Sequence, residues 1–78
     1  MYIIQEYQTD SNGNVAIVTP VEQANWFDAL SVYHQKLMYA ALAENIMIVV
    51  VLCDNYGTEY KKEIVNKLNG NDSPPVEE

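Results

Sequence analysis

The stretch Ile46-Met47-Ile48-Val49-Val50-Val51-Leu52-Cys53 decides the fold, because every position in it is apolar. A strand with one face in water alternates apolar and polar residues, whereas an uninterrupted apolar run is typical of a strand covered on both faces. The run is far shorter than the roughly 20 residues that a membrane-spanning helix needs. We therefore expect a strand at the centre of a sheet.

Turn-forming residues on both sides of this run predict two β-hairpins. The cluster Asp54-Asn55-Tyr56-Gly57 follows it directly, and residues 58–65 then form a mostly exposed partner strand. Near the N-terminus, residues 1–8 and 15–19 flank a second turn cluster at residues 10–14. Pro20 cannot donate to a strand ladder, so we expect residues 15–19 at a sheet edge. Residues 64–68 could instead form a last helical turn.

A single helix is expected between the hairpins. Two segments place a capping residue three positions before a carboxylate, Thr19-Pro20-Val21-Glu22 and Asn25-Trp26-Phe27-Asp28, and the apolar periodicity favours the second. The helix then runs to about Glu44, and Asn45 suits a left-handed cap. Its apolar stripe is centred on Leu30 and contains Trp26, Phe27, Tyr33, His34, Leu37 and Ala41.

These elements predict an α+β fold of order β-β-α-β-β, a four-stranded antiparallel sheet with one helix packed on one face. Residues 1–68 form the single domain, and residues 69–78 form a disordered acidic tail. One helix covers one face, so the two-sided apolar strand requires a second cover. A second copy of the chain, packed sheet to sheet as a homodimer, is the simplest one, and an obligate partner protein is the alternative. The expected interface residues are Tyr2, Ile4, Met47, Val49, Val51 and Tyr60.

Composition restricts the possible partners. The 78 residues include 4 Lys plus Arg against 11 Asp plus Glu, a net charge of −7 that opposes binding to nucleic acid or to an anionic membrane. The N-terminus lacks the basic and long apolar segments of a secretory signal, and the one cysteine, Cys53, lies in an apolar run. We therefore expect a reduced thiol and a cytoplasmic location.

The sequence gives little support for catalysis. His34 is the only histidine and lies at the margin of the predicted helix stripe, so a packing role at the edge of the core is favoured over that of a general base. The alternating polar residues 10–14 begin like a calcium loop but lack its later Gly and Glu. We expect no enzymatic activity, no cofactor, no metal site and no small-molecule substrate. An alternative function is that of an acidic inhibitor that occupies the basic cleft of a host nucleic-acid-binding protein.

The opening Tyr2-Ile3-Ile4-Gln5-Glu6-Tyr7-Gln8, the Asn12-Gly13 turn and the segment Ser31-Val32-Tyr33-His34-Gln35-Lys36-Leu37 leading into Ala40-Ala41 carry a resemblance over residues 2–65. They resemble short proteins without an established activity that are encoded in phages and prophages of Gram-positive gut bacteria. The resemblance implies a phage-related origin and association with a virion or its assembly. It singles out Tyr33 and His34.

Overall fold

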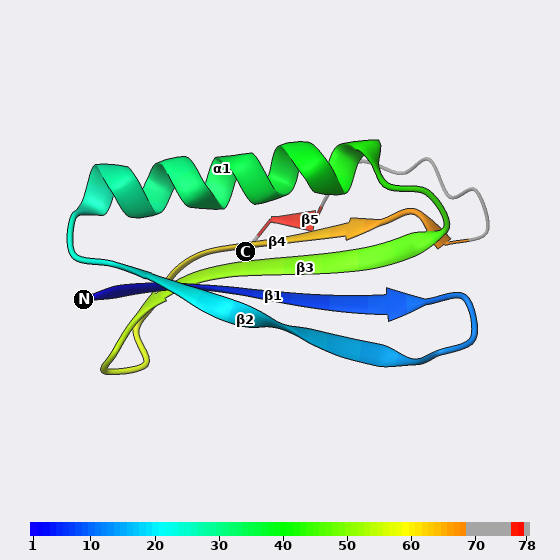
Figure 1. The fold of residues 1–78 in the computed structure, drawn as a ribbon, viewed down its shortest axis with the longest axis horizontal. Helices are drawn as coiled ribbons and strands as arrows, with labels where there is room; N and C mark the ends of the chain where they lie inside the picture. Colours follow the sequence, from blue (N-terminus) through cyan, green and yellow to red (C-terminus); the bar gives the residue numbers. More distant parts are fainter. Residues whose placement is uncertain (69–75, 78) are drawn as a thin grey trace.

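A computed structural model of the chain describes residues 1–68 and 76–77, and it has the predicted β-β-α-β-β order (Figure 1). The helix lies along the length of the sheet, on one side of it. The elements are β1 Tyr2–Asp10, β2 Val15–Gln23, α1 Trp26–Leu42, β3 Ile46–Asp54, β4 Glu59–Asn66 and β5 Val76–Glu77.

The strands form one antiparallel sheet of order β2-β1-β3-β4-β5. The apolar run is therefore an inner strand, as predicted, and β2 lies at an edge. β2 continues through Pro20 to Gln23, because a bulge in β2 interrupts the ladder there: Ile4 pairs with Val21, whereas Glu6 pairs with Val18. The prolyl nitrogen thus falls at a position where the regular pairing is already broken.

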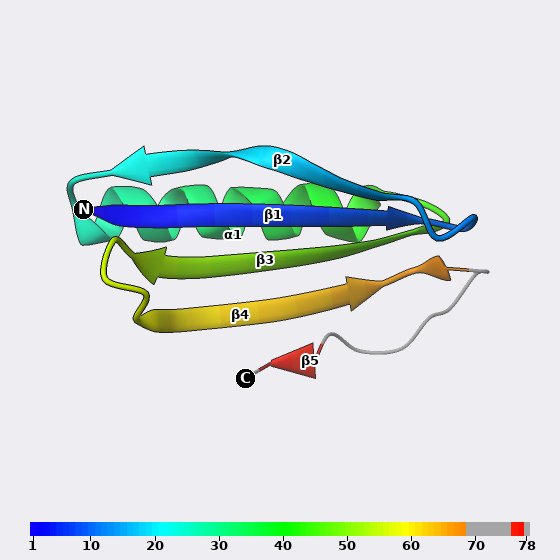
Figure 2. The same cartoon turned by 90° about the horizontal axis from the view of Figure 1, so that it is seen from below.

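β5 adds two residues to the outer side of β4, at Glu63 and Ile64 (Figure 2). This differs from the tail expected over residues 69–78, within which Val76–Glu77 are assigned to the sheet. The other residues of that expected tail lie outside the described part of the chain. The alternative of a helical turn over residues 64–68 is not observed for Ile64–Asn66, which belong to β4.

Both hairpins close with the same hydrogen-bonded turn, which starts at an aspartate. The Asp10 carboxylate accepts from the amides of Asn12 and Asn14, at 2.9 and 3.0 Å, and Asp54 does the same for Tyr56 and Thr58, both at 2.9 Å. The glycine three residues after each aspartate has a positive φ, 83° at Gly13 and 89° at Gly57. The Asp-x-x-Gly spacing therefore fixes both turns through local chemistry.

The helix begins where the capping pattern predicts. The side chain of Asn25 accepts from the Phe27 and Asp28 amides at 2.9 and 3.4 Å. At the other end the ammonium of Lys67 donates to the Ala41 carbonyl at 2.7 Å, and Asn45 has the expected left-handed φ of 56°. The helix ends at Leu42, slightly before the expected boundary.

The rotation of the helix about its axis differs from the expected one. Its buried residues are Ala29, Tyr33 and Ala40. The side of the helix that packs on the sheet is therefore centred on these residues and not on Leu30. The expected stripe favoured bulky residues, but small alanines facing the sheet let the helix backbone approach the strands closely. Phe27, His34 and Ala41, expected on the stripe, are exposed. The packing role predicted for His34 at the core edge is therefore wrong.

The core lies entirely between the helix and the sheet. Alternate residues of β3, namely Ile48, Val50 and Leu52, are at most 5% exposed and pack with Ile4 beneath the helix alanines. One ion pair spans the two layers: Lys36 Nζ of the helix lies 3.0 Å from Glu6 Oε1 of β1. The residues between Ile48, Val50 and Leu52 in β3 point to the other face.

Candidate functional site: the open sheet face

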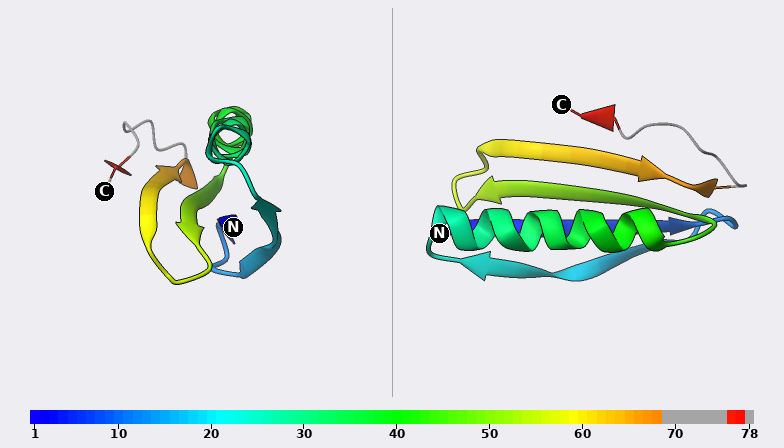
Figure 3. Two further views of the ribbon diagram at one scale, coloured as in Figure 1. Left: turned by 90° about the vertical axis from the view of Figure 1, so that its left-hand side faces the viewer. Right: turned by 90° about the horizontal axis from the view of Figure 1, so that it is seen from above.

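The face of the sheet opposite the helix is not covered by any element of residues 1–68 or 76–77. Figure 2 shows the sheet in front with α1 behind it, and β5 extends the sheet at its edge and does not fold beneath it. The end-on view in Figure 3 shows the helix on one side only. We call this surface the open sheet face.

The strand register gives the composition of this face row by row. Side chains on one face of neighbouring strands lie next to each other where their residues are paired. Pairing across β2, β1, β3 and β4 creates one continuous apolar row, Ile17–Tyr7–Val49–Ile64. The flanking rows are Val15–Thr9–Met47–Asn66 and, without β2 where the bulge occurs, Gln5–Val51–Lys62. One row of the face is thus apolar across the whole width of the sheet, and the two rows beside it are mixed.

Charge is almost absent from the middle of the open sheet face. In the three rows described above, Lys62 is the one charged residue. A fourth row, Glu22–Ile3–Cys53–Glu59, has a carboxylate at each end. The Tyr7 hydroxyl, which is the main polar group of the apolar row, donates to Gln5 Oε1 at 2.6 Å. Its hydrogen bond is therefore satisfied within the face.

The exposed fractions distinguish the two faces of β3. Met47, Val49 and Val51 are half-buried, whereas their neighbours in the strand are buried under the helix. Farther out, Val15 and Ile17 of the edge strand are 64% and 72% exposed. Exposed apolar side chains that continue a partly buried apolar row are typical of an interaction surface.

The expected interface residues divide between the two faces. Met47, Val49 and Val51 lie together on the open sheet face. Ile4 has no exposed surface and belongs to the core, which places it outside any interface. Tyr2 lies on the same side of β1, because the two residues are two positions apart in the strand.

Tyr60 is turned towards the helix side by an irregularity in β4. Leu52 pairs with Lys61 while Cys53 pairs with Glu59, so Tyr60 is an extra residue in the ladder. Its ring meets those of Tyr2 and Trp26 edge to face, with centroids 5.8 and 5.5 Å away. These rings close the core at the start of the helix, and the sequence gives no sign of the bulge that brings them together.

Cys53 and Asp54, which lie near this end, both have shifted pKa values. Burial raises the pKa of the Cys53 thiol, and the nearby carboxylates of Asp54 and Glu59 raise it further. Partial burial would raise the pKa of Asp54, but donors from Thr58, Tyr60 and Tyr56 outweigh it and lower the value. Cys53 is therefore a thiol at neutral pH, a weak nucleophile on the open sheet face.

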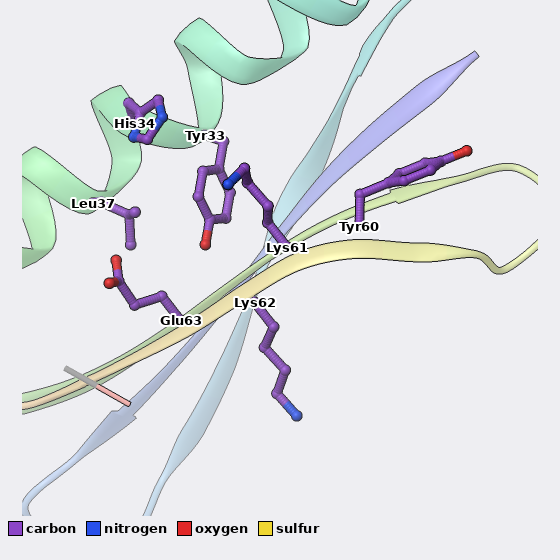
Figure 4. Close-up of a pocket in the computed structure, with 7 residues that line it drawn as sticks. All are labelled: Tyr33, His34, Leu37, Tyr60, Lys61, Lys62 and Glu63. Carbon is purple, nitrogen blue, oxygen red and sulfur yellow. The ribbon is translucent and has the colours of Figure 1, made fainter. Parts of the chain in front are cut away.

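A groove of about 330 Å³ lies between α1 and β4, as the second candidate site. Figure 4 shows Tyr33 and Leu37 extending from the helix and Lys61 and Glu63 reaching up from the strand, while Lys62 points to the other side. The charges of Lys61 and Glu63 are opposite, so the groove selects neither an anion nor a cation by net charge. His34 lies at its rim, with its ring 5.5 Å from that of Tyr33.

Several carboxylates of the described residues have structural roles. Glu6 is paired with Lys36, and Asp10 and Asp54 organise the two turns. Within the same residues no group of three or more His, Cys, Asp and Glu side chains could hold a metal ion. No helix in that part of the chain has the length and apolarity needed to cross a membrane.

Comparison with known proteins identifies no relative from which a function could be transferred. No family model, curated protein or solved structure matches the chain. The open sheet face is therefore the feature from which a function can be argued.

Proposed function

We propose that the chain is a non-enzymatic protein-association module, and that its open sheet face packs against the same face of a second copy. The observation that carries this proposal is the uncovered apolar row Ile17–Tyr7–Val49–Ile64. Two such sheets packed face to face, about 10 Å apart, form a β-sandwich with one helix layer on each outer side. A homodimer of this kind covers the second face of β3.

The area of the face is sufficient for a specific dimer. Three of the four strands have nine residues and β4 has eight. With strands about 4.8 Å apart and a rise of about 3.3 Å per residue, the face measures roughly 19 by 30 Å. Two faces together bury on the order of 1,100 Å², close to the lower limit of about 1,200 Å² for standard interfaces. This size supports a dimer that dissociates on dilution.

The distribution of charge favours a second copy over a strongly charged partner. Each chain carries a net charge of −7, which opposes association of any two acidic surfaces. The apolar row of the open sheet face and its two flanking rows contain no carboxylate, and the one charged residue in them is Lys62. Two copies can therefore meet there without bringing carboxylates together, whereas a basic partner would find no matching charge.

The resemblance to short phage proteins supports a structural role in a virion or in its assembly within a bacterial host. Cys53 is the one cysteine of the chain and so has no partner for an internal disulfide, which supports a reducing compartment. We therefore propose a cytoplasmic site of assembly. The alternative of an acidic inhibitor would require carboxylates free for a basic cleft, and three of them are engaged as described above.

Sedimentation velocity on single-charge variants tests the proposal. Ile17→Glu places two carboxylates in the apolar row of a dimer, and desolvating each of them without a partner costs several kcal/mol. We expect this variant and Val49→Glu to sediment as monomers at concentrations where the wild type is dimeric. Tyr56→Glu is the matched control, because Tyr56 is 88% exposed in a turn and receives the same charge.

The proposal fails if Ile17→Glu and Val49→Glu remain as dimeric as the wild type while circular dichroism shows them folded. It also fails if the wild type is a monomer at every concentration. Capture of a basic nucleic-acid-binding protein, lost in high salt and on neutralising Glu59 and Glu63, would favour the inhibitor instead.

A further inference from the structure

The surface of α1 that faces solvent is unusual because it lacks charge. At about 100° per residue, Phe27, Ser31, His34 and Leu42 lie within roughly 50° of Met38. We call these five residues the outer helix face. Phe27, Met38 and Leu42 are 75%, 55% and 73% exposed. An ordinary surface helix presents charged side chains in such positions.

The charged residues of the helix lie elsewhere. Asp28 is near the N-terminal end, about 80° from Met38 around the helix, and Lys36 points to the sheet, where it pairs with Glu6. Three large apolar side chains therefore share one uncharged stripe on a protein of net charge −7. Exposed apolar stripes of this kind are typical of protein contacts.

We infer that the outer helix face pairs with the same face of a second copy, as an antiparallel helix pair about a two-fold axis. In that arrangement Phe27 lies opposite Leu42 and Ser31 lies opposite Met38. A small residue then faces a large one at the second contact, which lets the helices approach closely. The paired stripes bring no carboxylate or ammonium group together.

The size of this contact makes it weaker than the one between sheets. The 17 residues of α1 extend about 25 Å at 1.5 Å per residue, and a helix contact is about 10 Å wide. A pair of such faces buries on the order of 500 Å², well below the roughly 1,200 Å² of a standard interface. Helix pairing alone is thus expected only at high protein concentration.

Together the two surfaces link copies into rows. The open sheet face and the outer helix face lie on opposite sides of the molecule (Figure 3). A dimer formed through the sheets would present one outer helix face on each outer side, so helix pairing would join dimer to dimer. This linking of dimers rests on the proposed function, whereas the helix pairing itself does not.

Sedimentation velocity over a concentration series tests the inference, with Met38→Glu as the variant and Tyr56→Glu as its control of equal charge. Each helix pair contains two copies of Met38, so we expect the variant to weaken association beyond the dimer by about tenfold or more. We expect the wild type and Tyr56→Glu to form species larger than the dimer. Circular dichroism checks the fold, which a substitution at this exposed position leaves intact.

The same series in an Ile17→Glu background separates the two surfaces. If Ile17→Glu changes nothing while Met38→Glu abolishes self-association, the proposed function fails and the helix pairing stands. The helix pairing is overturned if Met38→Glu self-associates to the same extent as the wild type, or if the wild type stops at a dimer that Ile17→Glu dissociates completely. Binding of the wild type to phosphatidylcholine vesicles, lost in Met38→Glu without any change in self-association, would overturn it in favour of a lipid surface.

Discussion

The ion pair between Glu6 and Lys36 provides a quantitative test of how the helix is held on the sheet. Lys36 Nζ and Glu6 Oε1 are 3.0 Å apart, and the two side chains are only 15% and 12% exposed. An exposed pair contributes about 0–1 kcal/mol, whereas breaking a buried one costs about 3–5 kcal/mol because a charge is left without its partner. The low exposure places this pair near the buried limit.

Lys36→Met removes the cation and leaves the Glu6 carboxylate beneath the helix. The other oxygen, Glu6 Oε2, keeps its hydrogen bond from Gln8 Nε2 at 2.6 Å, so part of the lost interaction is retained. We therefore expect Lys36→Met to lower the free energy of unfolding by about 2–3 kcal/mol. The double variant Glu6→Leu with Lys36→Met buries no charge, and we expect it to lie within about 1 kcal/mol of the wild type.

Urea unfolding followed by the fluorescence of Trp26, the one tryptophan of the chain, measures these differences. All variants are compared at one protein concentration, because association through the open sheet face would make the apparent stability depend on it. A loss below about 0.5 kcal/mol in Lys36→Met would show that the pair behaves as an exposed one. A double variant as unstable as Lys36→Met would contradict the role given to the unpaired carboxylate.

Three further predictions concern the helix cap, a turn and the thiol. Asn25→Ala removes the acceptor for two helix amides, and we expect a loss of about 1 kcal/mol in the same urea assay; no loss would contradict the capping role. Donors to the Asp54 carboxylate lower its pKa in the folded state, so its ionised form stabilises the turn above the unfolded-state pKa, and this contribution is lost as the pH falls through the lower folded-state value. The difference in free energy of unfolding between the wild type and Asp54→Asn should thus shrink on acidification below about pH 4. A difference that grew below that pH would contradict a lowered pKa of Asp54 in the folded state. Cys53 lies on the open sheet face, so we expect a thiol reagent to modify it faster in the monomeric variant Val49→Glu than in the wild type, and equal rates would argue against burial of Cys53 in a dimer.

Much of the fold could be predicted because local chemistry determines it. The apolar run from Ile46 to Cys53 identifies an inner strand, and an aspartate followed by a glycine three positions later marks both turns. Asn25 likewise identifies the start of the helix, because few other residues can accept from its first amides. These signals are contained within a few consecutive residues.

The orientation of side chains was harder to predict because it depends on packing between elements. Alanines at positions 29 and 40 decide which side of the helix meets the sheet, although Phe27 is larger and more apolar. The face to which Tyr60 points depends on a bulge near Cys53, and no residue type in this segment predicts that bulge. The face on which Ile4 lies is also hard to predict, because apolar residues occupy both faces of β1 and its alternation is weak.

The most direct test of the open sheet face is an isotope-filtered NOE experiment on a mixture of labelled and unlabelled chains. It detects only methyl contacts between different molecules. We predict intermolecular NOEs that join the methyl groups of Ile17, Val49, Val51 and Ile64, and none from the core residues Ile48 and Val50. Intermolecular NOEs confined to other surfaces, or their absence at concentrations where the protein is dimeric, would contradict association through this face.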